Sequence, residues 1–302
     1  MVTYTYKWSL RKGGAKMICP QCGKKRFVPF VLTADGKTLA GVEFGRCDRE
    51  QSCGYFRYPS GEAKVTVEVE PRPELPPALF AFGDYDIFLD DLTKNSLIMA
   101  YYPLTGYNKI ADTCRVYHVR TGYGGECIYP QYDGDFFRTA KAISYGEDGH
   151  RLKDTDGKTL PVYWMHKAPA YSKYMQAHQL KQCFFGQHLL RLHPTAEVWI
   201  VEAEKTAVLM AATDERTARV WLACGGSQML KGAIDLQCLE GRDVVLVPDD
   251  GQYWNWKRTA DANGWACADI SQEVFKLNLK SGADIWDIKE KLLTWDVPKL
   301  YL

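Results

Sequence analysis

The 302-residue sequence has no apolar run approaching the roughly 20 residues that a membrane-spanning helix needs. Its first residues, Met-Val-Thr-Tyr-Thr-Tyr, lack the basic and apolar regions of a secretory signal peptide. The chain also lacks a charge excess, since 38 basic and 37 acidic residues leave a net charge of +1. Its ten cysteines do not follow the spacing of a disulfide framework. These absences argue against a membrane or secreted protein and predict a cytoplasmic one.

Four of the cysteines lie within the first 53 residues and form two pairs. Two residues separate Cys19 from Cys22, and five separate Cys47 from Cys53. Four thiolates are the ligand set of a closed, tetrahedral structural zinc site, so we predict that these cysteines bind Zn²⁺. The second pair is wider than the usual spacing, and four buried thiols without a metal are the alternative.

The surroundings of these cysteines suggest a ligand. Residues 1–58 contain eleven Lys or Arg and four Asp or Glu, a local net charge of +7, interleaved with aromatic residues such as Phe44, Phe56 and Tyr58. Basic residues neutralise phosphates, and exposed aromatic rings stack on unpaired bases. We therefore predict nucleic acid as the partner. The alternative is that the aromatic residues form the core and the charges only maintain solubility.

Chain length and the pattern of expected strands and helices predict an α/β and α+β multidomain protein. Residues 1–58 form a zinc ribbon, residues 59–77 a Pro- and Glu-rich linker with an edge strand near residues 65–69, residues 78–191 a strand-rich domain, and residues 192–302 an α/β domain with a parallel sheet.

The expected elements follow from local pattern. In the strand-rich domain they are a helical opening over Phe80–Ala100 and strands at 113–119, 127–132 and 136–144. In the last domain they are strands at 198–201, 219–223 and 244–247, with helices at 204–212 and 229–234.

Acidic residues follow two of the predicted buried strands. Glu202 and Glu204 come after the strand at 198–201, and Asp249 and Asp250 after the strand at 244–247. Ligands of open α/β sheets bind outside the carboxyl ends of the strands, and carboxylates gathered there can hold Mg²⁺. Each cluster taken alone is better explained by capping of the next helix. Their joint position favours a magnesium site.

The segment V-E-A-E-K-T-A, from Val201 to Ala207, resembles the V-E-G-E-K-D-A signature of Toprim domains in DnaG-type primases. The glycine turn at 223–227, the strand with its acidic end at 244–250 and the segment 282–287 resemble three further parts of that domain. Residues 128–138 and 183–190 are similar to the strand-rich half of a primase core. With the zinc ribbon in front, the order resembles Toprim primase-like proteins carried by bacterial mobile genetic elements.

The resemblance implies DNA replication as the process and gives each acidic residue a role. Glu202 would be the acid/base-like glutamate, Asp249 the main ligand of Mg²⁺ or Mn²⁺, and Asp250 and Glu204 helpers. The sequence departs from the family at Ala203, where a glycine is usual, and at Gly251, where the second aspartate of D-x-D belongs. Asp250 replaces that aspartate only if the chain turns sharply there.

Nucleotide-binding residues are expected beside the acidic site. They are Lys205, next to Glu204, and two basic residues of the middle domain, Arg138 and Lys141. The latter two are three residues apart on a predicted strand, so they point to opposite faces unless a bulge intervenes. Solvated surface charge is the alternative for each of them.

Three functions remain open at this point. The first is a primase-like protein that binds single-stranded DNA and joins ribonucleotides, working with a replicative helicase. The second is a catalytically degenerate nucleic-acid-binding accessory protein, and the third is a Toprim nuclease. The aromatic run 253–256 either packs on the sheet or stacks a base. The remaining cysteines are expected in the core: Cys114, Cys127, Cys183, Cys224, Cys238 and Cys267.

Overall fold

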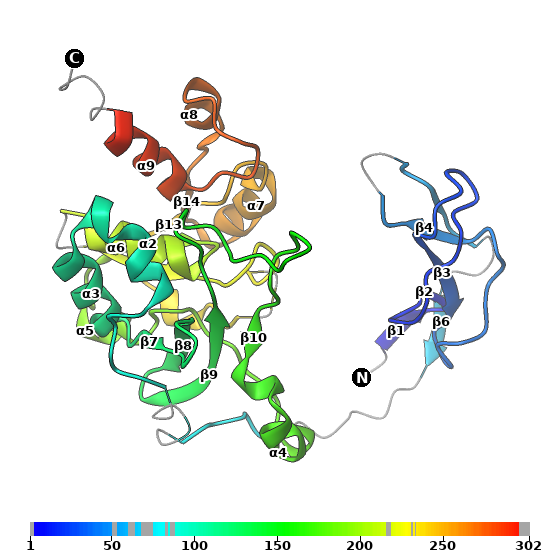
Figure 1. Ribbon diagram of the computed structural model, residues 1–302. Helices are drawn as coiled ribbons and strands as arrows, with labels where there is room; N and C mark the ends of the chain where they lie inside the picture. Colours follow the sequence, from blue (N-terminus) through cyan, green and yellow to red (C-terminus); the bar gives the residue numbers. More distant parts are fainter. Residues whose placement is uncertain are drawn as a thin grey trace. The chain divides into compact units, whose positions relative to one another are not determined.

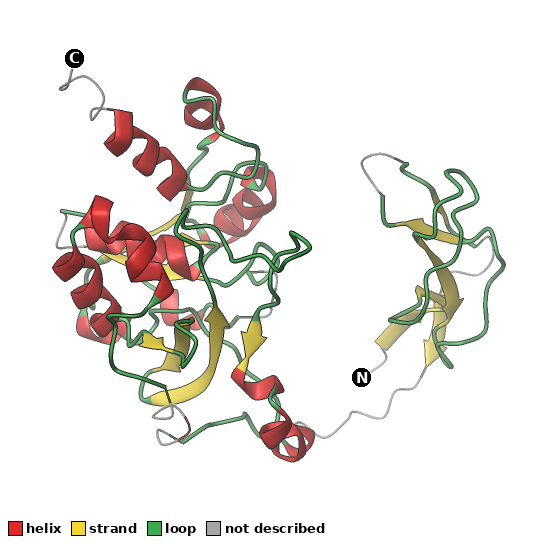
Figure 2. Ribbon diagram, in the orientation of Figure 1, coloured by secondary structure: helices red, strands yellow, loops and turns green. Residues whose placement is uncertain are grey.

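The computed structural model describes residues 3–49, 53–59, 64–67, 75–81, 84, 88–215, 219–230, 232 and 234–295. Two compact units divide the chain, Met1–Pro73 and Glu74–Leu302. The first is built from strands, and the second from helices and strands (Figures 1 and 2). Most of the predicted linker over residues 59–77 lies outside the described residues.

Short antiparallel strands form the first unit. The main sheet has the order β2-β3-β4-β5, and a separate ladder pairs β1 with β6. Part of the edge strand expected near residues 65–69 is therefore present as β6, and residues 68–69 lie outside the description. The strands are β1 (Thr3–Tyr6), β2 (Trp8–Leu10), β3 (Phe27–Leu32), β4 (Gly45–Cys47), β5 (Phe56–Arg57) and β6 (Lys64–Val67).

The second unit contains an antiparallel sheet of order β10-β9-β8-β7. Its strands are β7 (Arg120–Thr121), β8 (Cys127–Asp133), β9 (Phe136–Ile143) and β10 (Tyr163–Trp164). The predicted strands at 127–132 and 136–144 are confirmed as β8 and β9. One side of their ladder, including Ile128 and Phe137, packs in a small core with Phe80. The other side carries Tyr129 and Lys141, which lie opposite each other in the register.

A β-bulge interrupts this ladder. Gln131 lies opposite Thr139 and Tyr132 lies opposite Phe137, so Arg138 has no residue opposite it. An extra residue on one strand breaks the strict alternation of faces. The spacing between Arg138 and Lys141 therefore no longer forces them onto opposite faces.

A parallel sheet of order β12-β11-β13-β14 follows, as the alternation of strands and helices predicts. Its strands are β11 (Glu197–Val201), β12 (Arg219–Ala223), β13 (Val244–Leu246) and β14 (Ala266–Cys267). The apolar side chains of β11 and β12 are almost all buried, which is typical of a sheet covered on both faces. The three predicted strands of this region are confirmed.

Helices complete the second unit. Figure 1 shows α2, α3 and α6 next to one another, and all three contact one another. The α-helices are α2 (Ser96–Thr105), α3 (Tyr107–Val116), α4 (Ser172–Ala177), α5 (Leu189–Leu192), α6 (Glu204–Thr213), α7 (Tyr253–Asn263), α8 (Ser271–Lys276) and α9 (Ile285–Trp295). Short 3₁₀ turns occur at Met165–Lys167, Pro169–Tyr171 and Gln237–Leu239. The helix predicted at 204–212 is confirmed as α6.

The strand predicted at 113–119 is wrong, because α3 covers most of that segment. Its buried residues, Ile110, Ala111 and Cys114, repeat with helical spacing and pack in the main core. Residues 82–83 and 85–87 of the helical opening expected over Phe80–Ala100 lie outside the described residues. Its last residues belong to α2, which begins at Ser96, where the Asn95 side chain accepts hydrogen bonds from the N–H groups of Leu97 and Ile98.

The helix predicted at 229–234 is also wrong in its described part, where residues 227–230 form turns and Ile234 bridges to Gln182. Two cysteines depart from the expected burial as well. Cys114, Cys127, Cys183 and Cys224 are buried, but Cys238 and Cys267 are only half-buried. Within the described part of the chain, no helix has the length and apolarity needed to span a membrane.

Candidate metal centre

The four N-terminal cysteines converge on one point. Their sulfur atoms all lie within 4.8 Å of one another. Cys19 Sγ is 3.7 Å from Cys53 Sγ, and Cys22 Sγ is 3.9 Å from Cys47 Sγ. A tetrahedron of thiolates around zinc, with Zn–S bonds of about 2.3 Å, has S–S edges of about 3.8 Å. The spacing of these sulfurs therefore fits a structural zinc ion.

Two tight turns bring the cysteines together. In the first, the Gly23 N–H donates to the Cys19 carbonyl, and Gly23 has a positive φ of 66°. In the second, the N–H groups of Cys53 and Gly54 both donate to the Arg49 carbonyl, and Gly54 has a φ of 67°. The second cysteine of each pair is thus followed by a glycine in the left-handed conformation, which glycine adopts readily.

The surface of the first unit exposes aromatic rings. Phe30 is buried and lies edge-on to Phe56 and Tyr58, with ring centroids 5.9 Å and 4.8 Å apart. Phe56 is 58% exposed and Tyr58 is 36% exposed, so only part of the aromatic set forms the core. The Arg57 guanidinium lies 5.4 Å from the centroid of Phe44. Exposed rings beside cations are the combination that single-stranded nucleic acids bind.

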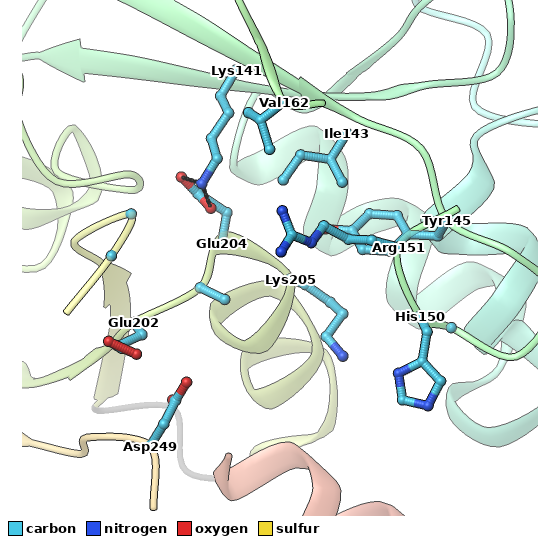
Figure 3. A pocket seen from close by; sticks show the side chains of 14 residues that line it. Lys141, Ile143, Tyr145, His150, Arg151, Val162, Glu202, Glu204, Lys205 and Asp249 are labelled. Atoms are coloured by element: carbon cyan, nitrogen blue, oxygen red, sulfur yellow. Dashed lines mark hydrogen bonds and ion pairs between the residues drawn. The ribbon is translucent and has the colours of Figure 1, made fainter. Parts of the chain in front are cut away.

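A second candidate centre lies at the carboxyl ends of β11 and β13, which are neighbours in the parallel sheet. Glu202 follows β11 and Asp249 follows β13, and Figure 3 shows their carboxylates directed toward each other. Burial, followed by the charge of Glu202 and a hydrogen bond with it, raises the pKa of Asp249 to about 9. One oxygen of Glu202 is buried without a hydrogen-bond partner. The pair has the negative charge and the donor capacity that a divalent cation would satisfy.

A cavity of about 380 Å³ adjoins this acidic pair. Its opposite wall carries His150 and Arg151 from the segment between β9 and β10, and Lys205 from α6. The glycine turn after β12 closes one side with Gly225 and Gly226. Carboxylates on one wall and cations on the other match a ligand that combines Mg²⁺ with phosphate.

The second glutamate of the V-E-A-E-K segment has a partner of its own. Glu204 is 2% exposed, and its two oxygens accept hydrogen bonds from Lys141 Nζ at 3.0 Å and 2.8 Å (Figure 3). Lys141 comes from β9, so this buried ion pair links the antiparallel sheet to α6. Gly225 lies close by, and a Cβ there would come within 3.2 Å of Glu204 Oε1. Glu204 and Lys141 lie beside the acidic pair but bind each other.

Lys205 faces a further acidic group. Burial works against its charge, but Asp284, Tyr101 and Asp287 outweigh burial and raise the pKa of Lys205. Asp284 also accepts a hydrogen bond from Thr206 Oγ1 at 2.5 Å. Asp284 and Asp287 each accept the other's backbone N–H at the start of α9, as in a capping box. The segment 282–287, which resembles part of a Toprim domain, therefore caps α9 with Asp284 and Asp287. Sequence reasoning missed Tyr101, because no motif marks it.

Two predicted residues lie away from the acidic pair. Asp250 accepts a hydrogen bond from the Gly282 N–H at 3.3 Å and lines a different, smaller cavity. The positive φ of Gly251, 84°, gives the turn that Asp250 needs, but this turn directs its carboxylate elsewhere. Arg138 donates to Asp133 at 2.7 Å and lines a cavity that has no residue in common with the one beside Glu202.

Residues 95–250 match the model of a family described as a domain of unknown function, DUF6371, and this match covers just over half of the chain. The chain belongs to the DUF6371 family. The DUF6371 match contains Lys141, Glu202, Glu204 and Asp249, so both the buried ion pair and the acidic pair lie within the family domain. The capping residues Asp284 and Asp287 lie beyond it.

Residues 4–67 of this DUF6371 protein match a zinc beta-ribbon finger model. Together with the four clustered cysteines, this match identifies the first unit as a zinc ribbon. Neither family match is to a Toprim model.

A solved structure that aligns with the DUF6371 protein is the primase fragment of the bacteriophage T7 primase-helicase protein. The identity is 14%, the alignment covers 93% of this chain and 98% of that chain, and the TM-score is 0.37. At that score no residue roles are transferred. No curated protein matches the sequence.

Proposed function

We propose that this protein is primase-like: its zinc ribbon binds single-stranded DNA, and its acidic pair joins ribonucleotides in the presence of Mg²⁺. The observation that carries the proposal is the pairing of Glu202 with Asp249 at adjacent strand ends, beside a cavity with a cationic wall. A protonated or metal-bound state of this pair relieves the repulsion between its carboxylates.

Glu202 and Asp249 would hold the metal ion. Their donor set fits Mg²⁺, which takes one or two carboxylates and completes its shell with water and phosphate oxygens. When bound, a divalent ion lowers the pKa of an attacking hydroxyl and neutralises charge on the phosphate. The buried Glu202 oxygen without a partner is the donor that the folded protein leaves for such a ligand.

The other residues of the cavity would orient the substrate. Arg151 and Lys205 offer cations to phosphate oxygens from the wall opposite the acidic pair. Lys141 would act differently, because both oxygens of Glu204 accept hydrogen bonds from its amino group. It would fix the start of α6, and with it the position of Lys205.

The test is template-directed synthesis by the full chain, with single-stranded DNA, labelled ribonucleotides and Mg²⁺ or Mn²⁺. We expect product from the wild type and a loss of about 10²–10⁴-fold in Glu202→Gln and in Asp249→Asn, the range for a positioned acid–base group. Glu240→Gln is the matched control, because Glu240 is exposed and lines a different cavity. Product that survives in Glu202→Gln would contradict the proposal.

The position of Asp250 favours a second candidate, a catalytically degenerate protein that only binds nucleic acid. With Asp250 turned toward Gly282, the site has one carboxylate fewer than a D-x-D motif supplies. The same assay separates the candidates. Retained DNA binding without product indicates the binding protein, and strand cleavage without ribonucleotides indicates a nuclease.

A further inference from the structure

An exposed tryptophan, Trp254, lines a cavity that Asp249 also lines. Helix α7 begins two residues after Gly251, and its Trp256 is buried, with the indole N–H donating to the Ser227 carbonyl at 3.2 Å. Trp254 is 74% exposed and lies two positions earlier, about 200° away around the helix. Trp256 therefore anchors α7 to the protein, and the packing of the helix leaves the Trp254 ring in solvent.

Trp254 lines a cavity of about 170 Å³ between the starts of α7 and α8. Pro248, Tyr253 and Ile270 contribute further apolar surface, and Tyr253 lies edge-on to Trp254 with ring centroids 5.0 Å apart. Asp249 lines both this cavity and the larger one that contains Glu202. Asp249 thus stands at the boundary between two differently lined spaces.

The two spaces differ in charge. The larger one carries Arg151 and Lys205 opposite the acidic pair. The smaller one adds Asp250 and Asp269 to Asp249, and no lysine or arginine is among its lining residues in the described part of the chain. Carboxylates repel a phosphate but accept hydrogen bonds from N–H groups of a neutral ring. The larger cavity therefore suits phosphates, and the smaller one suits a base.

We propose that the smaller cavity binds an unpaired nucleobase, stacked on Trp254, from a nucleotide whose phosphate lies in the larger cavity, held by Arg151 and Lys205 and by a divalent cation on Glu202 and Asp249. This inference rests on the proposed function. Asp250 already accepts one hydrogen bond from Gly282, and Asp269 accepts two from Ser271, yet a carboxylate has about four acceptor positions. Bases with an exocyclic amino group, such as cytosine, are therefore favoured over thymine and uracil.

The experiment measures the affinity of the full zinc-loaded chain for fluorescent oligo-dC and oligo-dT, each with and without Mg²⁺. The variants are Trp254→Ala, Trp254→Phe and Asp249→Asn. Phe275→Ala is the matched control, because Phe275 is 86% exposed on α8 and does not line the cavity. Thermal unfolding of all variants verifies that each is folded.

We expect Trp254→Ala to weaken oligo-dC binding by about 5- to 150-fold, which corresponds to the loss of one stacked base. Trp254→Phe should retain most of the affinity, and Phe275→Ala should bind like the wild type. The wild type should prefer oligo-dC to oligo-dT, and this preference should disappear in Trp254→Ala.

The same measurements distinguish failure of this inference from failure of the proposed function. If Trp254→Ala binds oligo-dC as tightly as Phe275→Ala does, base stacking is overturned, even where Mg²⁺ tightens binding through Asp249. If Mg²⁺ has no effect and Asp249→Asn equals the wild type, the metal site is overturned, while the Trp254 comparison still decides the inference. Equal affinity for oligo-dC and oligo-dT would overturn recognition by the carboxylates.

Discussion

The zinc ribbon and the acidic pair gather ligands in opposite ways. In the ribbon, four sulfurs lie within 4.8 Å of one another, brought there by two tight turns. In the second unit, Glu202 and Asp249 come from the ends of two strands, and no third carboxylate or imidazole of the described residues completes a cluster of that size. A closed set of four ligands is typical of a structural metal, whereas two carboxylates leave positions for water and substrate.

The two regions also differ in what stabilises them. The buried apolar cluster of the ribbon consists of Cys19, Phe27 and Cys47, so two of its three members are metal ligands. The second unit has a large continuous core that includes Trp221 and Trp286 and joins both of its sheets. The fold of the first region should depend on its metal, and the fold of the second should not.

The largest effect is expected from zinc removal. Structural zinc contributes an apparent 10–16 kcal/mol in small zinc domains, roughly their whole folding free energy. Cys19→Ser combined with Cys47→Ser should abolish zinc binding and expose residues 1–73 to protease, while the second unit keeps its unfolding transition. Elemental analysis and limited proteolysis of the full chain measure both effects. Cys238→Ser is the control, and a double variant that keeps one zinc per chain would contradict the assignment.

The next largest effect is a loss of stability confined to the second unit. Lys141→Met leaves Glu204 buried without its partner, and we expect a loss of about 3–5 kcal/mol in the free energy of unfolding, measured by urea titration. Lys141→Met combined with Glu204→Met should recover most of this loss, because no charge is then buried. Arg191→Met, which breaks an exposed pair with Asp135, should change stability little. If Lys141→Met and Arg191→Met lowered the free energy of unfolding equally, the expected difference between the buried and the exposed ion pair would be refuted.

A further effect depends on pH and is smaller for each pH unit than the loss expected in Lys141→Met. Because the pKa of Asp249 rises from 3.8 to about 9 on folding, the folded protein holds a proton that the unfolded chain has released. Stability present below about pH 4 should therefore decline as the pH rises to about 9, by at most about 1.4 kcal/mol per pH unit. Urea titrations without Mg²⁺ should show this decline in the wild type and a flatter profile in Asp249→Asn. Asp156 is exposed, so Asp156→Asn should keep the wild-type slope. If Asp249→Asn also keeps that slope, the assignment of the pH dependence to Asp249 is wrong.

The smallest effect concerns the contact between α3 and the parallel sheet. The buried Tyr117 hydroxyl, just after α3, donates to the Trp221 carbonyl of β12 at 2.7 Å. Tyr117→Phe should cost about 1 kcal/mol in the free energy of unfolding, because the carbonyl loses its buried partner. Tyr123→Phe alters a side chain that is 82% exposed and should have no measurable effect. Zinc content should stay unchanged in both variants.

Short apolar runs bounded by turn residues made the parallel sheet predictable. The runs at 198–201, 219–223 and 244–247 are buried strands, and parallel order places Glu202 and Asp249 at the same edge. The segment 113–119 was wrongly predicted as a strand, because its β-branched and aromatic residues favour strands. Tertiary packing makes most of it part of helix α3 instead.

Other features of the candidate site depend on contacts between residues far apart in sequence. Nothing local to Glu204 indicates that Lys141, 63 positions earlier, binds it. Likewise, the direction of Asp250 depends on its contact with Gly282, 32 positions later. The motif located the site, but only the packing shows which carboxylates face each other.

The buried pair of Lys141 and Glu204 also constrains how this protein can change over generations. The two residues are encoded 63 codons apart, on either side of the boundary between the antiparallel and parallel sheets. A recombination event that exchanged only one of them for a neutral residue would leave a charge in the interior without a partner. The two halves of the second unit are therefore expected to be inherited together, whereas the zinc ribbon can be exchanged as a separate module.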